Sequence, residues 1–317
     1  MGIVVTCVLL ILGLALLIKG SDFFVEGSAG LAHNFKVPPL IVGLTIMAFG
    51  TSSPEVFIGV RSALNGTTSL AIGNVIGSDI FNLIFIIGLA ALIRPMKVKF
   101  KEISRDFWVA IAGPILLLLM MLYFDTEIPR LGGIFFLFLF AIYIIWIIFA
   151  TTKKRKELKN QETLEDFVPR PLKHNILLGI FGLVLILVGG ELTVHNAVSI
   201  AESLGMSPRL VGLTIIAMGT SLPELIIVLT ASKRGDNEMA VGNIIGSSIF
   251  NIMFVLGLTG TVAPLPIEIR FIWDLLFLIG ASFVFLIFVL TRKKLTRLEG
   301  GVMVLMFLAY FGHSIFS

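Results

Sequence analysis

The sequence predicts an all-α membrane protein with ten transmembrane helices, arranged as two inverted five-helix repeats. The 317 residues are 57% hydrophobic and 14% charged, with a mean hydropathy of +1.02, whereas soluble domains are about 25% charged. Apolar runs close to the ~20 residues that cross a bilayer as a helix recur along the chain. In addition, polar motifs of the first half return in the second half at one constant offset, which pairs Glu55 with Glu224 and Asn82 with Asn251.

The apolar runs define the expected spans in order. They cover approximately residues 3–20, 38–61, 69–93, 107–124, 131–150, 174–192, 208–231, 238–262, 271–291 and 299–316. Glycines in the third and eighth spans weaken a continuous helix. The polar segment 151–173 separates the halves, so we expect a first five-helix repeat (1–150), a cytoplasmic loop (151–173) and a second, inverted repeat (174–317).

The distribution of basic residues predicts the orientation. Of the 24 Lys and Arg residues, 20 fall in loops on one side of the predicted membrane and four on the other. Because cytoplasmic loops carry the excess of Lys and Arg, both termini are expected outside the cell and the loop 151–173 in the cytoplasm. This predicts a multi-pass protein of the cell membrane, surrounded by lipid bilayer. The same distribution argues against nucleic acid as a partner.

The internal repeat is close enough to indicate duplication. Residues 39–55 and 208–224 share 12 identities in 17 positions without a gap. Since each half has an odd number of spans, the second copy crosses the membrane in the opposite sense, as in many secondary transporters. A duplication with a purely structural role should be most similar at apolar packing positions. Here the most similar parts are polar and lie within predicted spans.

Each copy contains two motifs with groups that can bind cations. AFGTSSPE (48–55) is followed by GNVIGSDIFN (73–82), and AMGTSLPE (217–224) by GNIIGSSIFN (242–251). Pro54 and Pro223 lie inside predicted helices, where proline lacks an N–H and displaces the carbonyl four residues back. Backbone carbonyls within 48–50 and 217–219 are therefore expected to be available as ligands.

Bringing the halves together collects oxygen ligands and no histidine or cysteine. The carboxylates are Glu55 and Glu224, and the neutral groups are the amides of Asn82 and Asn251 and the hydroxyls of Thr51, Ser52, Ser78, Thr220, Ser221 and Ser247. Calcium takes about 6–8 oxygens at flexible geometry, and sodium tolerates similar ligands, whereas zinc and copper usually prefer nitrogen or sulfur. Two carboxylates give a formal charge of −2, which one Ca²⁺ or two Na⁺ would neutralise.

The duplicated GTS-x-PE and GN-x-IGS-x-IFN motifs resemble the alpha repeats of the sodium/calcium exchanger family. The resemblance implies ten helices, an antiport mechanism, ion sites on the second, third, seventh and eighth helices, and a sliding gate formed by the first and sixth. Carried over by position, the implied ligands are Ala48, Thr51, Ser52, Glu55, Ser78, Asn82, Ala217, Thr220, Ser221, Glu224, Ser247 and Asn251. Ala48 and Ala217 would contribute backbone carbonyls.

Two positions depart from this pattern. Some family members carry aspartate where this chain has Asn251, so we expect only two essential carboxylates. Potassium-dependent relatives use an extra acid in this region, which leaves potassium dependence open. Asp79 matches Ser248 in the other copy and is turned about 100° from Ser78 on an ideal helix. We expect it beside the ligands or in a cavity, with direct ligation or a structural pairing as alternatives.

The leading functional hypothesis is exchange of Na⁺ for Ca²⁺ by alternating access. H⁺/Ca²⁺ antiport is the nearest alternative, although proton-coupled relatives tend to place an acid in the GN block, where Asn82 and Asn251 stand. A cation channel needs a continuous path, which paired inverted motifs do not favour. An enzyme is not expected, because the polar set has no nucleophile–base arrangement and no cofactor loop. We expect no cofactor and no obligate protein partner.

Overall fold

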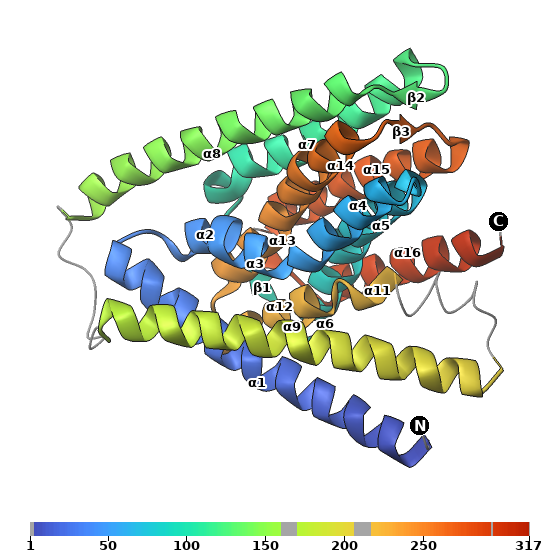
Figure 1. Cartoon of the computed structure of the whole chain (residues 1–317). Helices are drawn as coiled ribbons and strands as arrows, with labels where there is room; N and C mark the ends of the chain where they lie inside the picture. Colours follow the sequence, from blue (N-terminus) through green and yellow to red (C-terminus); the bar gives the residue numbers. More distant parts are fainter. Residues whose placement is uncertain (1–2, 160–169, 206–216, 293, 317) are drawn as a thin grey trace.

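The computed structural model describes residues 3–159, 170–205, 217–292 and 294–316, and these residues are nearly all helical. Two long helices, α1 (Ile3–Phe35) and α9 (Leu172–Ser203), lie side by side along one edge of the molecule. The helix α8 (Arg130–Lys159) runs along the opposite edge, and the remaining elements fill the centre (Figure 1). The fold therefore has a peripheral helix pair set against a central group of helices.

Glycines bring α1 and α9 into backbone contact. A Cβ atom added at Gly20 would lie 2.8 Å from the carbonyl oxygen of Gly182, and one added at Gly189 would lie 2.7 Å from the amide nitrogen of Leu17. Small residues at helix interfaces allow this close approach, which replaces the hydrophobic driving force that membrane helices lack. The two helices therefore form one tightly packed unit, here called the α1/α9 pair.

Four of the central spans are interrupted or locally irregular. In chain order they are α2 (Pro39–Val42), η1 (Gly43–Met47), α3 (Ala48–Thr51) and α4 (Ser53–Leu64); α5 (Thr68–Ile80), η2 (Phe81–Ile86) and α6 (Ile87–Ile93); α11 (Ala217–Gly219) and α12 (Leu222–Arg234); and α13 (Asn237–Ile249), η4 (Phe250–Val255) and α14 (Leu256–Val262). The η segments are π-helical turns. The bounds of α5, η2 and α6 recur in α13, η4 and α14 at the same offset that pairs Glu55 with Glu224.

Uninterrupted helices and two short sheets complete the fold. The helices are α7 (Phe100–Tyr123), α15 (Ile269–Arg292) and α16 (Arg297–Phe316). Strand β1 (Met96–Lys97) pairs antiparallel with β4 (Lys294–Leu295), and β2 (Glu127–Ile128) pairs with β3 (Leu265–Pro266). Each sheet joins a strand from the first half of the chain to one from the second half.

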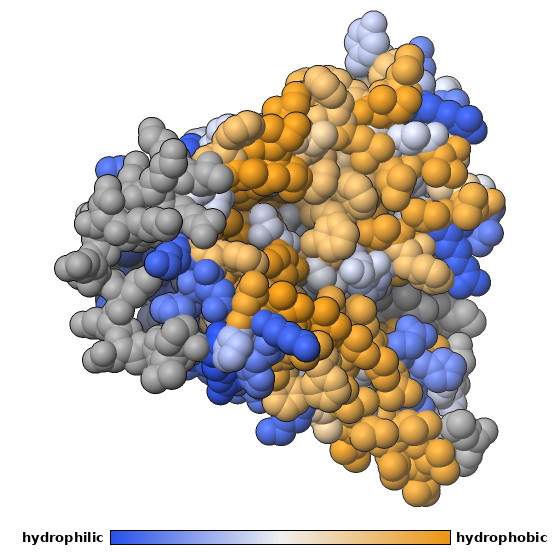
Figure 2. Space-filling model, turned by 60° about the vertical axis from the view of Figure 1, so that its left-hand side comes forward, coloured by the Kyte–Doolittle hydropathy of each residue, from blue (hydrophilic) through white to orange (hydrophobic). Residues whose placement is uncertain are grey.

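Seven helices in the described part of the chain are long and apolar enough to cross a membrane, and the bent pair Pro39–Thr51 and Ser53–Leu64 makes an eighth span if counted as one. The helix α16 is not among them, and the expected span 208–231 begins in residues that the structure does not describe. The count of ten therefore remains a prediction. Figure 2 shows broad apolar surface on one face, between patches of hydrophilic residues, as expected for a membrane protein.

Several helices exceed their expected limits. The first expected span ended near residue 20, but α1 continues to Phe35 because its polar residues find partners on α12. Ser21 donates a 2.8 Å hydrogen bond to Thr230, and Asp22 lies 3.5 Å from the guanidinium of Arg234. Similarly, α8 reaches Lys159, so the beginning of the segment 151–173 is helical rather than loop. The glycines of the third and eighth spans do not interrupt their helices; the π-helical turns lie between them, at Phe81–Ile86 and Phe250–Val255.

Candidate ion-binding site

The first motif lies where the second span bends. Ser52 separates α3 from α4, and the two parts are inclined by 46°. Pro54 occupies the first turn of α4, where a missing N–H costs nothing. The carbonyl that this N–H would have reached in a continuous helix belongs to Gly50. Thr51, Ser52 and Glu55 next to the bend are all fully buried.

The second copy repeats this geometry. The helix α11 ends at Gly219, and α12 begins at Leu222 with Pro223 in its first turn. Ser221 and Glu224 are fully buried, whereas Thr220 is partly buried. Both glutamates are thus held inside the protein at the start of a helix that follows a break.

The two glutamates belong to one polar centre. Ser52 donates a 3.1 Å hydrogen bond to Oε1 of Glu224, and Ser78 donates a 3.4 Å hydrogen bond to Oε1 of Glu55. The carboxylates lie near enough for their charges to repel each other. Within the described residues, the Oε2 atoms of both glutamates have no hydrogen-bond partner. Each carboxylate is therefore fixed through one oxygen and keeps the other for a cation.

Further unpaired oxygens come from the break in the seventh span, from the eighth span and from the π-helical turns. Asn82 lies in η2 and Asn251 in η4. Among the residues described, no hydrogen-bond partner is found for Oδ1 of either asparagine or for the hydroxyls of Ser221 and Ser247. Buried polar atoms normally have partners, and leaving them unpaired is costly. Such a cluster of buried, unpaired oxygens fits a site that receives a dehydrated cation.

Two asparagines that the sequence analysis did not assign also belong to this centre. Thr51 donates a 3.4 Å hydrogen bond to Oδ1 of Asn243, and Thr220 donates a 3.3 Å hydrogen bond to Oδ1 of Asn74. Each bond joins the first motif of one half to the second motif of the other. The available signal was the shared GN dipeptide that opens both second motifs at equivalent positions of the repeat.

The alanines stand at the start of the broken segments. The carbonyl of Ala48 accepts a 3.0 Å hydrogen bond from the Ser52 amide, and it shares the Thr51 hydroxyl proton, at 3.3 Å, with Asn243. A cation at this carbonyl would therefore compete with the Thr51 hydroxyl. Ala217 is the first residue of α11, which places its backbone at the equivalent point of the second copy.

Asp79 contacts a candidate ligand. The side chain of Asp79 is fully buried, and its Oδ1 accepts a 3.0 Å hydrogen bond from Nδ2 of Asn251. This bond directs the amide nitrogen of Asn251 to Asp79 and leaves the amide oxygen for other contacts. Across the described ranges, no group of three or more His, Cys, Asp or Glu side chains is arranged to hold a metal ion. A cation at this centre would therefore depend on Glu55, Glu224 and neutral oxygens.

Comparison with known proteins identifies the family. The chain matches the family described as "Sodium/calcium exchanger protein" over residues 5–149 and 174–316. The chain belongs to the sodium/calcium exchanger family. It is 30% identical over 342 residues to the sodium/calcium exchanger MaX1 of Methanosarcina acetivorans, with 97% of this chain and 98% of MaX1 covered. It is 36% identical over 269 residues to the inner membrane protein YrbG of Escherichia coli, with 82% and 81% covered.

A solved structure supports the same conclusion. The sodium-calcium exchanger NCX_Mj, soaked with Na⁺ and Sr²⁺, matches this exchanger with a TM-score of 0.83 and 31% identity, over 98% of this chain and 99% of NCX_Mj. The family consists of membrane transporters rather than enzymes. The family match and the structural match together support a cation/Ca²⁺ exchanger. The resemblance inferred from the duplicated motifs is confirmed.

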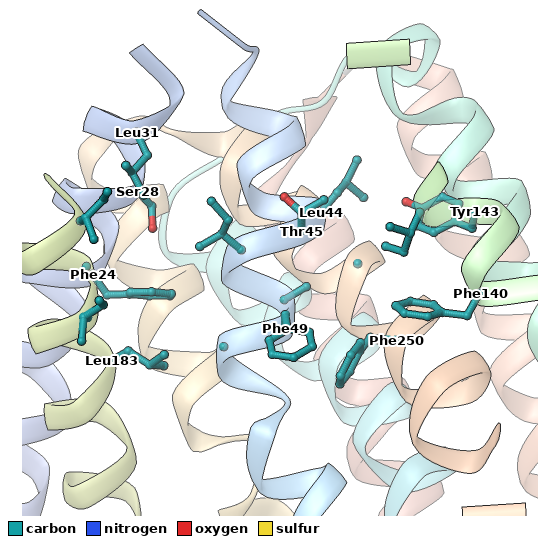
Figure 3. A pocket seen from close by; sticks show the side chains of 18 residues that line it. Phe24, Ser28, Leu31, Leu44, Thr45, Phe49, Phe140, Tyr143, Leu183 and Phe250 are labelled. Carbon is teal, nitrogen blue, oxygen red and sulfur yellow. The ribbon is translucent and has the colours of Figure 1, made fainter. Parts of the chain in front are cut away.

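An apolar cavity lies between the α1/α9 pair and the central helices. It measures about 460 Å³, and Figure 3 shows Phe24 and Leu183 from the pair on one side, with Phe49 and Phe250 on the other. Its lining is mostly apolar, which does not suit a cation. It marks a place where the pair is loosely packed against the centre.

Proposed function

We propose that this exchanger is a secondary antiporter that moves Na⁺ against Ca²⁺ across the cell membrane by alternating access. The observation that carries the proposal is the buried centre shared by Glu55 and Glu224. Each glutamate has one oxygen bound to a serine and, in the described residues, one oxygen without a partner. The two known exchangers reported above, MaX1 and NCX_Mj, are both sodium/calcium exchangers by name.

The charge of the centre favours these two ions. Two carboxylates carry −2, which one Ca²⁺ or two Na⁺ balance, and a third Na⁺ would be bound through neutral oxygens. Calcium requires about 6–8 oxygens. The proposed ligands are the side chains of Thr51, Ser52, Glu55, Ser78, Asn82, Thr220, Ser221, Glu224, Ser247 and Asn251, with the carbonyls of Ala48 and Ala217.

The burial of the centre provides the coupling. Glu55 and Glu224 are fully buried, and two uncompensated charges in a closed, dry site are expensive. An empty exchanger would therefore rarely change its access from one side to the other. Only an exchanger whose site is neutralised by one Ca²⁺ or by Na⁺ would change its access, and this condition enforces exchange.

The architecture provides the movement. We assign residues 1–150 and 174–317 to two inverted five-helix repeats, with both termini extracellular and 151–173 cytoplasmic. The α1/α9 pair, rigid in itself because of its glycine contacts, would slide across the central helices. The apolar cavity next to Phe49 and Leu183 allows such a displacement without breaking polar contacts there.

Ion-substituted flux in proteoliposomes tests the proposal. Calcium uptake is measured with an outward Na⁺ gradient, with the pH gradient collapsed and K⁺ omitted. We expect uptake that follows the Na⁺ gradient alone. Uptake that requires a proton gradient would replace Na⁺ with H⁺ as the driving ion, and uptake that requires K⁺ would add a third ion. Unitary currents much faster than transporter turnover would indicate a channel.

A further inference from the structure

A second, much smaller cavity lies beside the proposed calcium site. It measures about 20 Å³, which is room for one water-sized particle. Five of its lining residues carry the argument, and they come from α5, α7, α13 and α15: Asp79, Ala110, Pro114, Ser248 and Ser282. Glu55 and Glu224 are not part of its lining, so the two sites have different carboxylates.

Asp79 lines this cavity and carries an unpaired carboxylate oxygen. Its Oδ1 accepts the hydrogen bond from Asn251, while Oδ2 is buried and has no hydrogen-bond partner in the described part of the chain. Asp79 itself is 0% exposed. A buried carboxylate that is only half satisfied is costly unless a cation or further donors compensate it.

Two serines line the same cavity as this carboxylate. Ser282 lines the cavity and donates its hydroxyl proton to the carbonyl of Leu278 at 2.7 Å. Its oxygen therefore keeps lone pairs for a cation. The hydroxyl of Ser248 is a second such group on the lining.

Pro114 adds a backbone ligand. It stands inside α7 and has no N–H, so the carbonyl four residues earlier loses its helical hydrogen bond. That carbonyl belongs to Ala110, and both residues line the cavity. A proline kink in a membrane helix is common and often structural. Here it frees the carbonyl of a residue that lines the same cavity as Asp79, Ser248 and Ser282.

The internal repeat shows that this arrangement is present only once. At the offset of the repeat, Asp79 corresponds to Ser248, Pro114 to Phe283, and Ser282 to Gly113. None of the three groups is therefore repeated: the acid and the proline occur only in the first copy and the Ser282 hydroxyl only in the second. The three departures from the repeat meet in one cavity, which points to a shared role.

We propose that Asp79, Ser248, Ser282 and the carbonyl of Ala110 form a second cation site that binds one monovalent cation of the size of Na⁺. A single carboxylate balances a single positive charge. Apolar side chains complete the lining, and its polar side chains, Asp79, Ser248 and Ser282, all offer oxygen, which suits an alkali cation. Four oxygens are too few for the 6–8 that calcium takes. This site goes beyond the proposed exchange reaction, because it needs neither Glu55 nor Glu224.

The test distinguishes the second cation site from the exchange site by removing both carboxylates of the exchange site. In purified Glu55→Gln/Glu224→Gln protein, thermal unfolding is followed while N-methyl-D-glucamine is replaced by Na⁺ at constant ionic strength. A ligand that binds only the folded state raises the Tm. We expect the Na⁺-dependent rise to persist in this background, to disappear in Asp79→Ser and in Ser282→Ala, and to persist in the control Thr261→Ala, which removes another backbone-bonded hydroxyl.

Three outcomes overturn the second site. These are a Tm that is equal in Na⁺ and N-methyl-D-glucamine, a rise that survives both Asp79→Ser and Ser282→Ala, and a rise that follows pH or K⁺ but not Na⁺. If the double glutamine background does not fold, the unmodified exchanger is saturated with Ca²⁺ and titrated with Na⁺ in the same way. The further rise in Tm must then be lost in Ser282→Ala.

Discussion

The Ser52 hydroxyl donates a 3.1 Å hydrogen bond to Oε1 of Glu224, a residue that lies 172 positions later in the chain. Through this bond the broken helix of the first half holds the carboxylate of the second half. The Thr51–Asn243 and Thr220–Asn74 bonds cross between the halves in the same way. Neither half therefore forms the centre alone.

Loss of the Ser52 hydroxyl should weaken calcium binding. Hydrogen bonds to charged groups contribute about 1.5–3 kcal/mol, and about 1.4 kcal/mol corresponds to a factor of ten in affinity. We expect Ser52→Ala to raise the calcium Kd at least about tenfold, measured by calorimetry on purified protein. Ser53→Ala is the matched control, because the Ser53 hydroxyl bonds to the carbonyl of Phe49 in its own span. Equal Kd values for the two variants would contradict the role of Ser52.

Asn74 and Asn243 should act as a symmetric pair. Each accepts one neutral hydrogen bond from a threonine of the other half, and such a bond contributes about 1 kcal/mol. We expect Asn74→Ala and Asn243→Ala each to weaken calcium-dependent transport about fivefold, measured as the half-saturating calcium concentration. The exposed Asn65→Ala provides the control. An effect in only one of the pair would argue against equivalent roles.

The close packing of α1 on α9 predicts a sensitive glycine. In Gly20→Ala the new Cβ would lie 2.8 Å from the carbonyl oxygen of Gly182 and from the amide nitrogen of Ile186, so the backbones must separate. Overpacking of this kind costs about 1–3 kcal/mol. We expect a clearly lower Tm for Gly20→Ala than for Gly280→Ala, where a Cβ meets nothing within 4 Å. Similar Tm values would mean that the contact is looser than described.

The contact between α1 and α12 should depend on salt. Arg234 lies 3.5 Å from Asp22 and 3.8 Å from Glu26, and all three side chains are about a third exposed. Ion pairs at such positions contribute less than about 1 kcal/mol. We expect Arg234→Gln to lower the Tm slightly at low ionic strength and not at all near 1 M salt. A loss that is independent of salt would indicate a packing role for Arg234.

The position of the glutamates could be predicted from the sequence because proline and glycine act locally. Pro54 and Pro223 cannot continue a helix, and the structure breaks each span shortly before its proline. The same reasoning was less accurate at the third and eighth spans. Their glycines remain helical, and the π-helical turns begin at Phe81 and Phe250.

Contacts between the halves were beyond sequence analysis. The repeated GN dipeptide places Asn74 and Asn243 at equivalent positions of the two copies. Their threonine partners, however, lie 146 and 192 positions away. The extension of α1 to Phe35 likewise depends on distant partners, namely Thr230 and Arg234. The placement of Asp79 beside Asn251 was expected only in general terms, and the structure specifies the hydrogen bond.

The central claim is that Glu55 and Glu224 together hold the exchanged cation. Sodium-driven calcium uptake into proteoliposomes tests it most directly, with Glu55→Gln, Glu224→Gln and unmodified protein reconstituted in equal amounts. The account predicts uptake by the unmodified exchanger and none above background for either variant. Sodium-driven calcium uptake that survives either substitution would contradict it.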